Sequence, residues 1–386
     1  MRTALLTGRF APRHDGVADY VARLRDALAE QGAEPLVVSA RGSEGADAEV
    51  CDRFDLRGVR EAARALDRLA PDVVHVQFAP SAYSFSPWVG LLPALVSRPV
   101  VTTLHEYGWW TGLPRVPAPV WGALEPRVDR ETLLLGPRSA ELLATNAGHA
   151  AQVRERLGRT PRLVPIGPNV RASALSRDEA RAAVTARWGV PPAADLLVFF
   201  GFVHPVKGVR YLLEGLATVR AELGRDVRLV VAGGFESLAL PGQEATDFRA
   251  ELVAHAASCG VTGAVVFTDH VPEDEVATLL RASDAVVLPL TAGVTSKSGA
   301  LLAALDSGCC TVATLPDSST DGVAEVVAPI AARRDGAAVA DALSRVLLDE
   351  DLRADLRCRA LARAAEHSWA SIAERHLEAY RAVLGP

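Results

Sequence analysis

Two lysines stand out among the basic side chains of this 386-residue sequence. Of its 41 lysine and arginine residues, only Lys207 and Lys297 are lysines. A lysine is a compact charge on a flexible stem, whereas an arginine presents a planar fork. Both lie just before a stretch with helical periodicity, in "HPVKG" and "TSKSG". A cation beside the free N–H groups of a helix start can bind phosphate, so each lysine is either part of an anion site or a solvated lysine before a helix.

Polar and aromatic side chains follow one apolar run in the first half of the chain. After "PVVTTL" come His105, Glu106 and then "YGWW", which contains Trp109 and Trp110. Ligands of parallel sheets bind outside the carboxyl ends of the strands, so His105 is a candidate site residue. Glu106 either orients a substrate or caps a loop. The two tryptophans either stack on a ring of a substrate or pack beneath a long loop.

Two further turns carry polar candidates. The tripeptide of His14, Asp15 and Gly16 occupies the first expected strand–helix turn, where Gly16 would allow the backbone to approach a ligand closely. His14 and Asp15 would then contact a second substrate. Asn146, in "LLATNAGHA", follows another expected strand and is either a ligand contact or a turn residue.

These candidates need two α/β domains to position them. Short apolar strands alternate with amphipathic helices, and the alternation restarts after a segment rich in Pro, Gly and Ser. We therefore predict two Rossmann-like, doubly wound parallel-sheet domains that face each other across a cleft. The expected domains are residues 1–170 and 171–367, followed by a final helix in 368–386.

The bulk composition excludes several classes of protein. A net charge of −6 gives no basic footprint for nucleic acid. The five cysteines have no zinc spacing, so we expect no metal site and reduced thiols. The start, "MRTALLTGRF", is too short for a signal-peptide core, and no run of about 18 apolar residues predicts a membrane span. We expect a cytoplasmic protein.

The order of the motifs resembles that of family 4 glycosyltransferases of the GT-B fold. The resemblance covers nearly the whole chain, and the closing "SWASIAERHLEAYRAVL" is similar to the helix that returns to the N-terminal domain in that family. The other matching stretches are "HDGVADYVARLRDALAEQG", "PDVVHVQF", "VVTTLHE", "PIGPNV", "GFVHPVKGVRYLLEGLATV", "RLVVAGG", "SDAVVLPL" and "SGALLAALDSGCCTVAT".

The resemblance implies a reaction and its substrates. The first domain would bind the acceptor and the second a nucleotide-diphosphate sugar, with UDP as the expected nucleotide. Transfer would retain the anomeric configuration and need no metal or other cofactor. We expect a small polar or natural-product acceptor, as in antibiotic biosynthesis. The expected partners are these two substrates, and a homodimer is left open.

The resemblance also assigns residues. His105 and Lys207 would be catalytic. The expected donor-binding residues are Gly16, Lys207, Val271, Thr295, Ser296, Lys297, Ser298 and Gly299. The expected acceptor-binding residues are His14, Asp15, Glu106, Trp109, Trp110 and Asn146.

The sequence departs from the family pattern at three positions. Phe202 stands where the family has an arginine, and the family's Glu-x7-Glu pair falls on Thr295 and Ala303. One alternative function is therefore a catalytically silent GT-B protein that binds a nucleotide sugar or supports a partner enzyme. A second is a nucleotide-sugar epimerase of the same architecture, although such a site should gather more carboxylates and histidines. The retained Lys207, Lys297 and His105 favour a glycosyltransferase.

Overall fold

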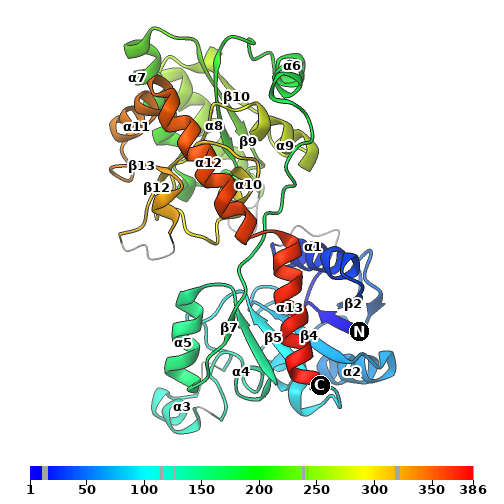
Figure 1. Cartoon of the computed structure of the whole chain (residues 1–386). Helices are drawn as coiled ribbons and strands as arrows, with labels where there is room; N and C mark the ends of the chain where they lie inside the picture. Colours follow the sequence, from blue (N-terminus) through cyan, green and yellow to red (C-terminus); the bar gives the residue numbers. More distant parts are fainter. Residues whose placement is uncertain are drawn as a thin grey trace. The chain divides into compact units, whose positions relative to one another are not determined.

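The computed structural model contains two compact units (Figure 1), and each is described by itself. The first unit is Met1–Gly167 together with Ser368–Pro386, and the second is Pro168–His367. The structure describes residues 1–10, 16–113, 116–125, 127–236, 240, 242–317 and 322–385.

The first unit is built on a seven-stranded parallel sheet with the order β3-β2-β1-β4-β5-β6-β7. Its two central strands, β4 and β5, are buried along their whole length, as expected of apolar strands that are covered on both faces. The strands are β1 (Arg2–Leu6), β2 (Glu34–Ser39), β3 (Ala48–Glu49), β4 (Val73–Phe78), β5 (Val100–Leu104), β6 (Glu141–Ala144) and β7 (Arg162–Leu163).

Helices cover both faces of this sheet (Figure 1). The last helix, α13, packs against α1 and buries Ile372, His376, Leu377 and Tyr380. The helical segments are α1 (Gly16–Glu30), α2 (Leu56–Leu69), η1 (Trp88–Ala94), α3 (Ala118–Leu124), α4 (Leu135–Arg138), α5 (Ala147–Leu157) and α13 (Trp369–Leu384).

The second unit has a six-stranded parallel sheet with the order β10-β9-β8-β11-β12-β13. Successive residues of β8 point to opposite faces, so Leu197 and Phe199 join one core while Leu196 and Val198 join the other. The strands are β8 (Asp195–Phe200), β9 (Val227–Ala232), β10 (Val265–Phe267), β11 (Ala285–Leu288), β12 (Thr311–Thr314) and β13 (Ala328–Ile330).

The first helix of the second unit, α6, starts with a capping box in which Ser176 and Glu179 exchange hydrogen bonds. Residues of α7, α8 and α11 contribute to one core and residues of α9 and α10 to the other. The segments are α6 (Arg177–Trp188), η2 (Pro205–Lys207), α7 (Val209–Leu223), α8 (Gly242–Ser258), η3 (Thr262–Ala264), α9 (Glu273–Ala282), α10 (Gly299–Asp306), η4 (Val323–Glu325), α11 (Gly336–Leu348) and α12 (Glu350–Glu366).

In each sheet, the first strands along the chain extend the sheet toward one edge and the later strands extend it toward the other edge. The reversal lies between β1 and β4 in the first unit and between β8 and β11 in the second. The predicted fold class, two doubly wound parallel sheets, is therefore confirmed. In such sheets the loops that follow the strands at the reversal form a crevice for ligands.

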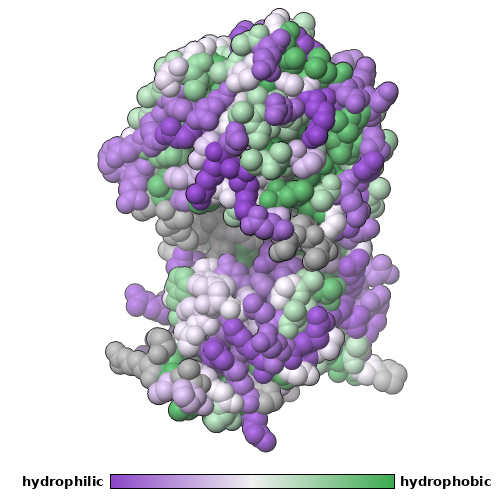
Figure 2. Space-filling view, turned by 90° about the vertical axis from the view of Figure 1, so that its left-hand side faces the viewer, coloured by the Kyte–Doolittle hydropathy of each residue, from purple (hydrophilic) through white to green (hydrophobic). Residues whose placement is uncertain are grey.

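The surface is mixed in character. Figure 2 shows hydrophilic residues over much of the visible face of both units, with hydrophobic residues scattered among them. Within the described ranges, the structure contains no helix that is both long enough and apolar enough to cross a bilayer.

Candidate functional site

The loops that carry the two lysines are joined at the reversal point of the second sheet. Thr291, just after β11, donates its backbone N–H to the carbonyl of Val206 at 2.9 Å. Gly208 has φ 72°, and a Cβ there would lie 2.0 Å from the carbonyl oxygen of Pro289. A side chain at 208 would therefore force apart the loop that follows β8 and the loop that leads to Lys297.

Lys207 is a partly buried cation at the end of η2, directly before α7. Among the described residues, no carboxylate pairs with its ammonium and no acceptor bonds to it. Burial lowers the pKa of Lys207 because the charged form loses hydration. An incoming anion would restore the missing stabilisation of this charge.

The loop of Lys297 leads into α10. Ser298 caps this helix by accepting a hydrogen bond from the N–H of Leu301 at 3.4 Å. The Lys297 side chain is exposed, and its backbone N–H donates to Oγ1 of Thr295 at 3.4 Å. The N–H of Gly299, in the first turn, has no preceding turn to bond to. Hydroxyls, a helix start and a cation therefore share one short loop, as the anion prediction requires.

The remaining donor candidates have different surroundings. Ser296 is partly buried, and Thr295 is exposed. The Val271 side chain is 7% exposed and packs in the core, so only its backbone can face a ligand. Ala303, where the family has its second glutamate, is fully buried among apolar side chains.

In the first unit, His105 directly follows β5 and is held from two directions. Its Nε2 lies 2.8 Å from Oε1 of Gln77, which belongs to the neighbouring strand β4. The ring of Tyr20, from α1, meets the His105 ring edge-on, with centroids 4.7 Å apart. His105 therefore lies at the carboxyl edge of the sheet, as predicted, with its ring orientation constrained by two other elements.

The predicted tryptophans lie in the loop after His105, and an aromatic residue of another loop, which sequence reasoning missed, lies beside them. Trp109 is 61% exposed, whereas Trp110 is partly buried against the core. Phe85 lies 6.4 Å from Trp109 and 6.3 Å from Trp110 between ring centroids, and it is 53% exposed. Its φ of 59° is a costly left-handed conformation for a bulky residue. The available signal was the aromatic stretch "AYSFSPW" after β4.

Two buried carboxylates anchor this aromatic loop. Glu131 accepts from the N–H of Gly108 at 2.7 Å and from Arg156 at 3.3 Å, and Asp129 accepts from the Tyr107 hydroxyl at 3.0 Å. Burial raises the pKa of Glu131 to about 7, although Arg156 and the Gly108 N–H act in the opposite direction. Glu106, a predicted acceptor contact, is partly buried in the same loop.

The first turn is described only from Gly16 onward, because His14 and Asp15 lie outside the described residues. Gly16 opens α1, and a Cβ there would meet no atom within 4 Å. The fold itself therefore leaves room for a side chain at this position. The glycine that a close approach requires is Gly8, where a Cβ would lie 2.1 Å from the carbonyl oxygen of Ala82.

Asn146 has a structural task in the first unit. Its Oδ1 accepts a hydrogen bond from the N–H of His149 at 3.0 Å, so it is the N-cap of α5. This is the turn-residue alternative left open by the sequence. A ligand contact would have to use the amide nitrogen.

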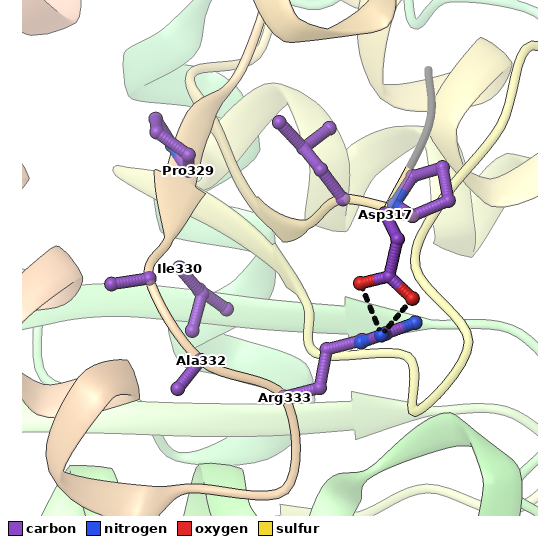
Figure 3. Close-up of a pocket in the computed structure, with 8 residues that line it drawn as sticks. Asp317, Pro329, Ile330, Ala332 and Arg333 are labelled. Carbon is purple, nitrogen blue, oxygen red and sulfur yellow. Dashed lines mark hydrogen bonds and ion pairs between the residues drawn. The ribbon is translucent and has the colours of Figure 1, made fainter.

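A hollow of about 560 Å³ lies beyond the ends of β12 and β13 (Figure 3). Asp317 and Arg333 face each other across it and form an ion pair at 2.6 Å. None of the predicted site residues lines it. In the part of the chain that the structure describes, no group of three or more His, Cys, Asp or Glu side chains is placed to hold a metal ion.

Comparison with known proteins agrees with this architecture. A D-inositol 3-phosphate glycosyltransferase of Nocardia farcinica is 29% identical over 63% of this chain and 52% of its own length. The chain spans about half the length of this and other curated relatives that it matches at similar identity.

Two solved structures share the fold over nearly their whole length. A glycosyltransferase of Rickettsia africae has a TM-score of 0.77 at 14% identity and covers 99% of this chain and 98% of its own. Anabaena HepE, solved in complex with UDP, has a TM-score of 0.72 at 15% identity and covers 98% of this chain and 99% of its own.

Two family descriptions match consecutive parts of the sequence. Residues 14–170 match "Glycosyltransferase Family 4", and residues 194–349 match "Glycosyl transferases group 1". The two matches fall on the two sheets, one on each. The chain therefore belongs to the family 4 glycosyltransferases of the GT-B fold.

Proposed function

We propose that the protein transfers a sugar from a UDP-linked donor to a hydroxyl of a small polar or natural-product acceptor, with retention of configuration and without a metal ion. The observation that carries the proposal is Lys207, a partly buried cation for which the described part of the chain provides no anion. It lies at the reversal point of the second sheet, where nucleotides bind in doubly wound folds.

The donor diphosphate would bind between the two lysine loops. Lys207 and Lys297 would supply charge, and the loop before α10 would supply the hydroxyls of Ser296 and Ser298 and the N–H of Gly299. Thr295, the backbone of Val271 and Gly16 are the other proposed contacts of the nucleotide sugar. UDP is favoured because Anabaena HepE, which shares the fold, was solved with UDP.

Departure of the nucleoside diphosphate is the step that the lysines would promote. The bond between the sugar C1 and the phosphate oxygen breaks, and C1 bonds to the acceptor oxygen on the same face. The acceptor proton passes to the departing phosphate oxygen, so no carboxylate base is needed. Negative charge grows on the diphosphate during this step, and the two lysine cations would stabilise it. His105 would orient a hydroxyl of the donor sugar.

The acceptor would bind near the aromatic loop of the first unit. Exposed Trp109, with Trp110 and Phe85 beside it, offers ring faces on which a sugar or aromatic ring can stack. Glu106 and Asn146 are the proposed polar contacts, and His14 and Asp15 complete the proposed set. We also propose a cytoplasmic location, because all five cysteines are free thiols.

The test begins with binding. Thermal unfolding is measured with UDP, GDP, ADP and their glucose conjugates, and stabilisation by UDP over the other two nucleotides is expected. Release of UDP from UDP-glucose with candidate acceptors then measures turnover, and NMR of the product gives its anomeric configuration. Activity should persist in excess EDTA. A requirement for Mg²⁺ or Mn²⁺ would overturn the metal-free mechanism.

A silent nucleotide-sugar-binding protein is the second candidate function. The buried alanine at position 303 favours it, because a carboxylate that contacts the donor in the family is replaced by core packing. This candidate predicts stabilisation by a nucleotide sugar without any turnover. Measurable transfer to any acceptor would exclude it.

A further inference from the structure

We infer that Gln77 is a positioning residue for His105, whose ring it holds with a proton on Nε2. A catalytic role for His105 rests on the proposed function, but the positioning itself concerns only the folded protein. The Gln77 side chain is fully buried in β4, and its carbonyl oxygen lies 2.8 Å from Nε2 of His105. A carbonyl oxygen can only accept, so the Nε2 of His105 must carry the proton.

The amide of Gln77 is itself fixed by a deeper histidine. His75 lies two residues earlier on β4, so its side chain points to the same side of the sheet. The Nε2 of Gln77 lies 3.2 Å and 3.1 Å from the two ring nitrogens of His75. With its nitrogen over this ring, the amide presents its oxygen to His105.

His75 is held in turn by two hydroxyls. Its Nδ1 lies 2.6 Å from the Tyr380 hydroxyl and its Nε2 lies 2.7 Å from Oγ1 of Thr103. Burial strongly lowers the pKa of His75, and the neighbouring His376 and His105 add to this effect, so the ring stays neutral. A chain of hydrogen-bonding groups therefore runs from the Tyr380 hydroxyl of α13 to His105.

Four elements surround this chain of groups. Strand β4 contributes His75 and Gln77, and β5 contributes Thr103 and His105. Helix α1 contributes Tyr20, and α13 contributes His376 and Tyr380. The titratable members that surround His105 are buried histidines and phenols. Burial raises the pKa of Tyr20 and Tyr380 and lowers that of His376 to about 4.

A neutral amide suits the proposed task better than a carboxylate. A carboxylate on Nε2 would stabilise imidazolium and raise the pKa of His105. An amide accepts the same hydrogen bond and brings no negative charge to the ring. An oriented imidazole can share a hydrogen bond with a sugar hydroxyl.

The first test is NMR of the protein labelled in its nine histidines. The His105 signals are assigned by their loss in His105→Ala. We expect the Nε2-protonated tautomer in the wild type and a His105 pKa at least one unit higher in Gln77→Glu. The nearly isosteric Gln77→Met should yield a mixture of tautomers. Thr102→Val, a buried change on the neighbouring strand β5, removes a hydroxyl that contacts Ser139 instead and should change neither property.

Two results would overturn the inference. One is an Nδ1-protonated His105 in the wild type, and the other is an unaltered tautomer and pKa in both Gln77 variants. These readings need no substrate, so they stand even if the proposed function fails. Should Gln77→Met not fold, the wild-type tautomer and the Gln77→Glu titration still decide the matter.

A double-mutant cycle on turnover then distinguishes a role of Gln77 in positioning His105 from a general role in packing. Gln77→Met should lower the kcat of UDP release from UDP-glucose at least tenfold, with less than a threefold change in the Kd for UDP. In a His105→Ala background the same substitution should have no further effect on kcat, because residues that act through one another are not additive. An undiminished effect of Gln77→Met in that background would show that Gln77 acts independently of His105.

Discussion

Replacing Lys207 with methionine should affect the free protein and the nucleotide complex in opposite directions. Methionine keeps a similar length and removes the charge. In the free protein this charge is partly desolvated and has no anionic partner among the described residues. Its loss should leave the free energy of unfolding unchanged or raise it by up to about 1 kcal/mol, because a partly buried charge carries only part of the cost of full desolvation.

In the nucleotide complex, the same substitution should remove a larger amount of binding free energy. A charge-assisted hydrogen bond to a phosphate contributes about 1.5–3 kcal/mol, which corresponds to a roughly 10- to 150-fold increase in Kd. Calorimetric titration with UDP measures this change, and thermal unfolding without ligand measures the other. A protein that is at least as stable as the wild type but binds UDP poorly is the expected pair of results.

Arg228→Met is the matched control. It also removes one positive charge from the second unit, but Arg228 lies near the amino end of β9, away from the carboxyl edge, and pairs with Asp226 at 2.7 Å. UDP affinity should stay within about twofold of the wild type, since distant surface charges are screened at physiological salt. If Lys207→Met binds UDP as tightly as this control, Lys207 is not a phosphate ligand and the central argument for the donor site is wrong.

Three further predictions address other parts of the two candidate sites. Lys297→Ala should weaken UDP and UDP-glucose binding equally, with little change for uridine, and Lys297→Arg should recover only part of the affinity; an equal loss for uridine in calorimetry would contradict a diphosphate contact. His105→Ala should leave UDP affinity nearly unchanged and lower turnover, whereas loss of the folded state in circular dichroism would indicate a structural histidine. Glu131 has a pKa near 7 against an ordinary value of 4.5, so its proton stabilises the fold at low pH and this contribution disappears as the pH rises through 7. Between pH 4.5 and 7.5 the wild type should therefore lose about 3 kcal/mol relative to Glu131→Gln in urea unfolding, and parallel pH profiles for the two proteins would refute the assignment.

The sequence by itself determined the order and type of the main elements. Apolar runs such as "DVVHVQF" became fully buried parallel strands because both faces of the sheet are covered. Ser176 and Glu179 specified a helix start through neighbours in the chain, and the structure contains that capping box. Lys207 and Lys297 could be placed before helices because glycine, serine and helical periodicity are local signals. Phe202, Thr295 and Ala303 could be recognised as departures because the surrounding motifs resemble those of a known family.

Only the tertiary structure decided which of these residues meet. Phe85 contacts the tryptophans of a loop that follows a different strand, and Tyr380 reaches His75 across 305 positions of the chain. The support of His105 by Gln77 depends on the register between β4 and β5, in which Gln77 pairs with Thr103. Local periodicity says which way a side chain points, whereas strand order and register decide what it faces. For the same reason Asn146, ambiguous as a residue type, became a helix cap once α5 was in place.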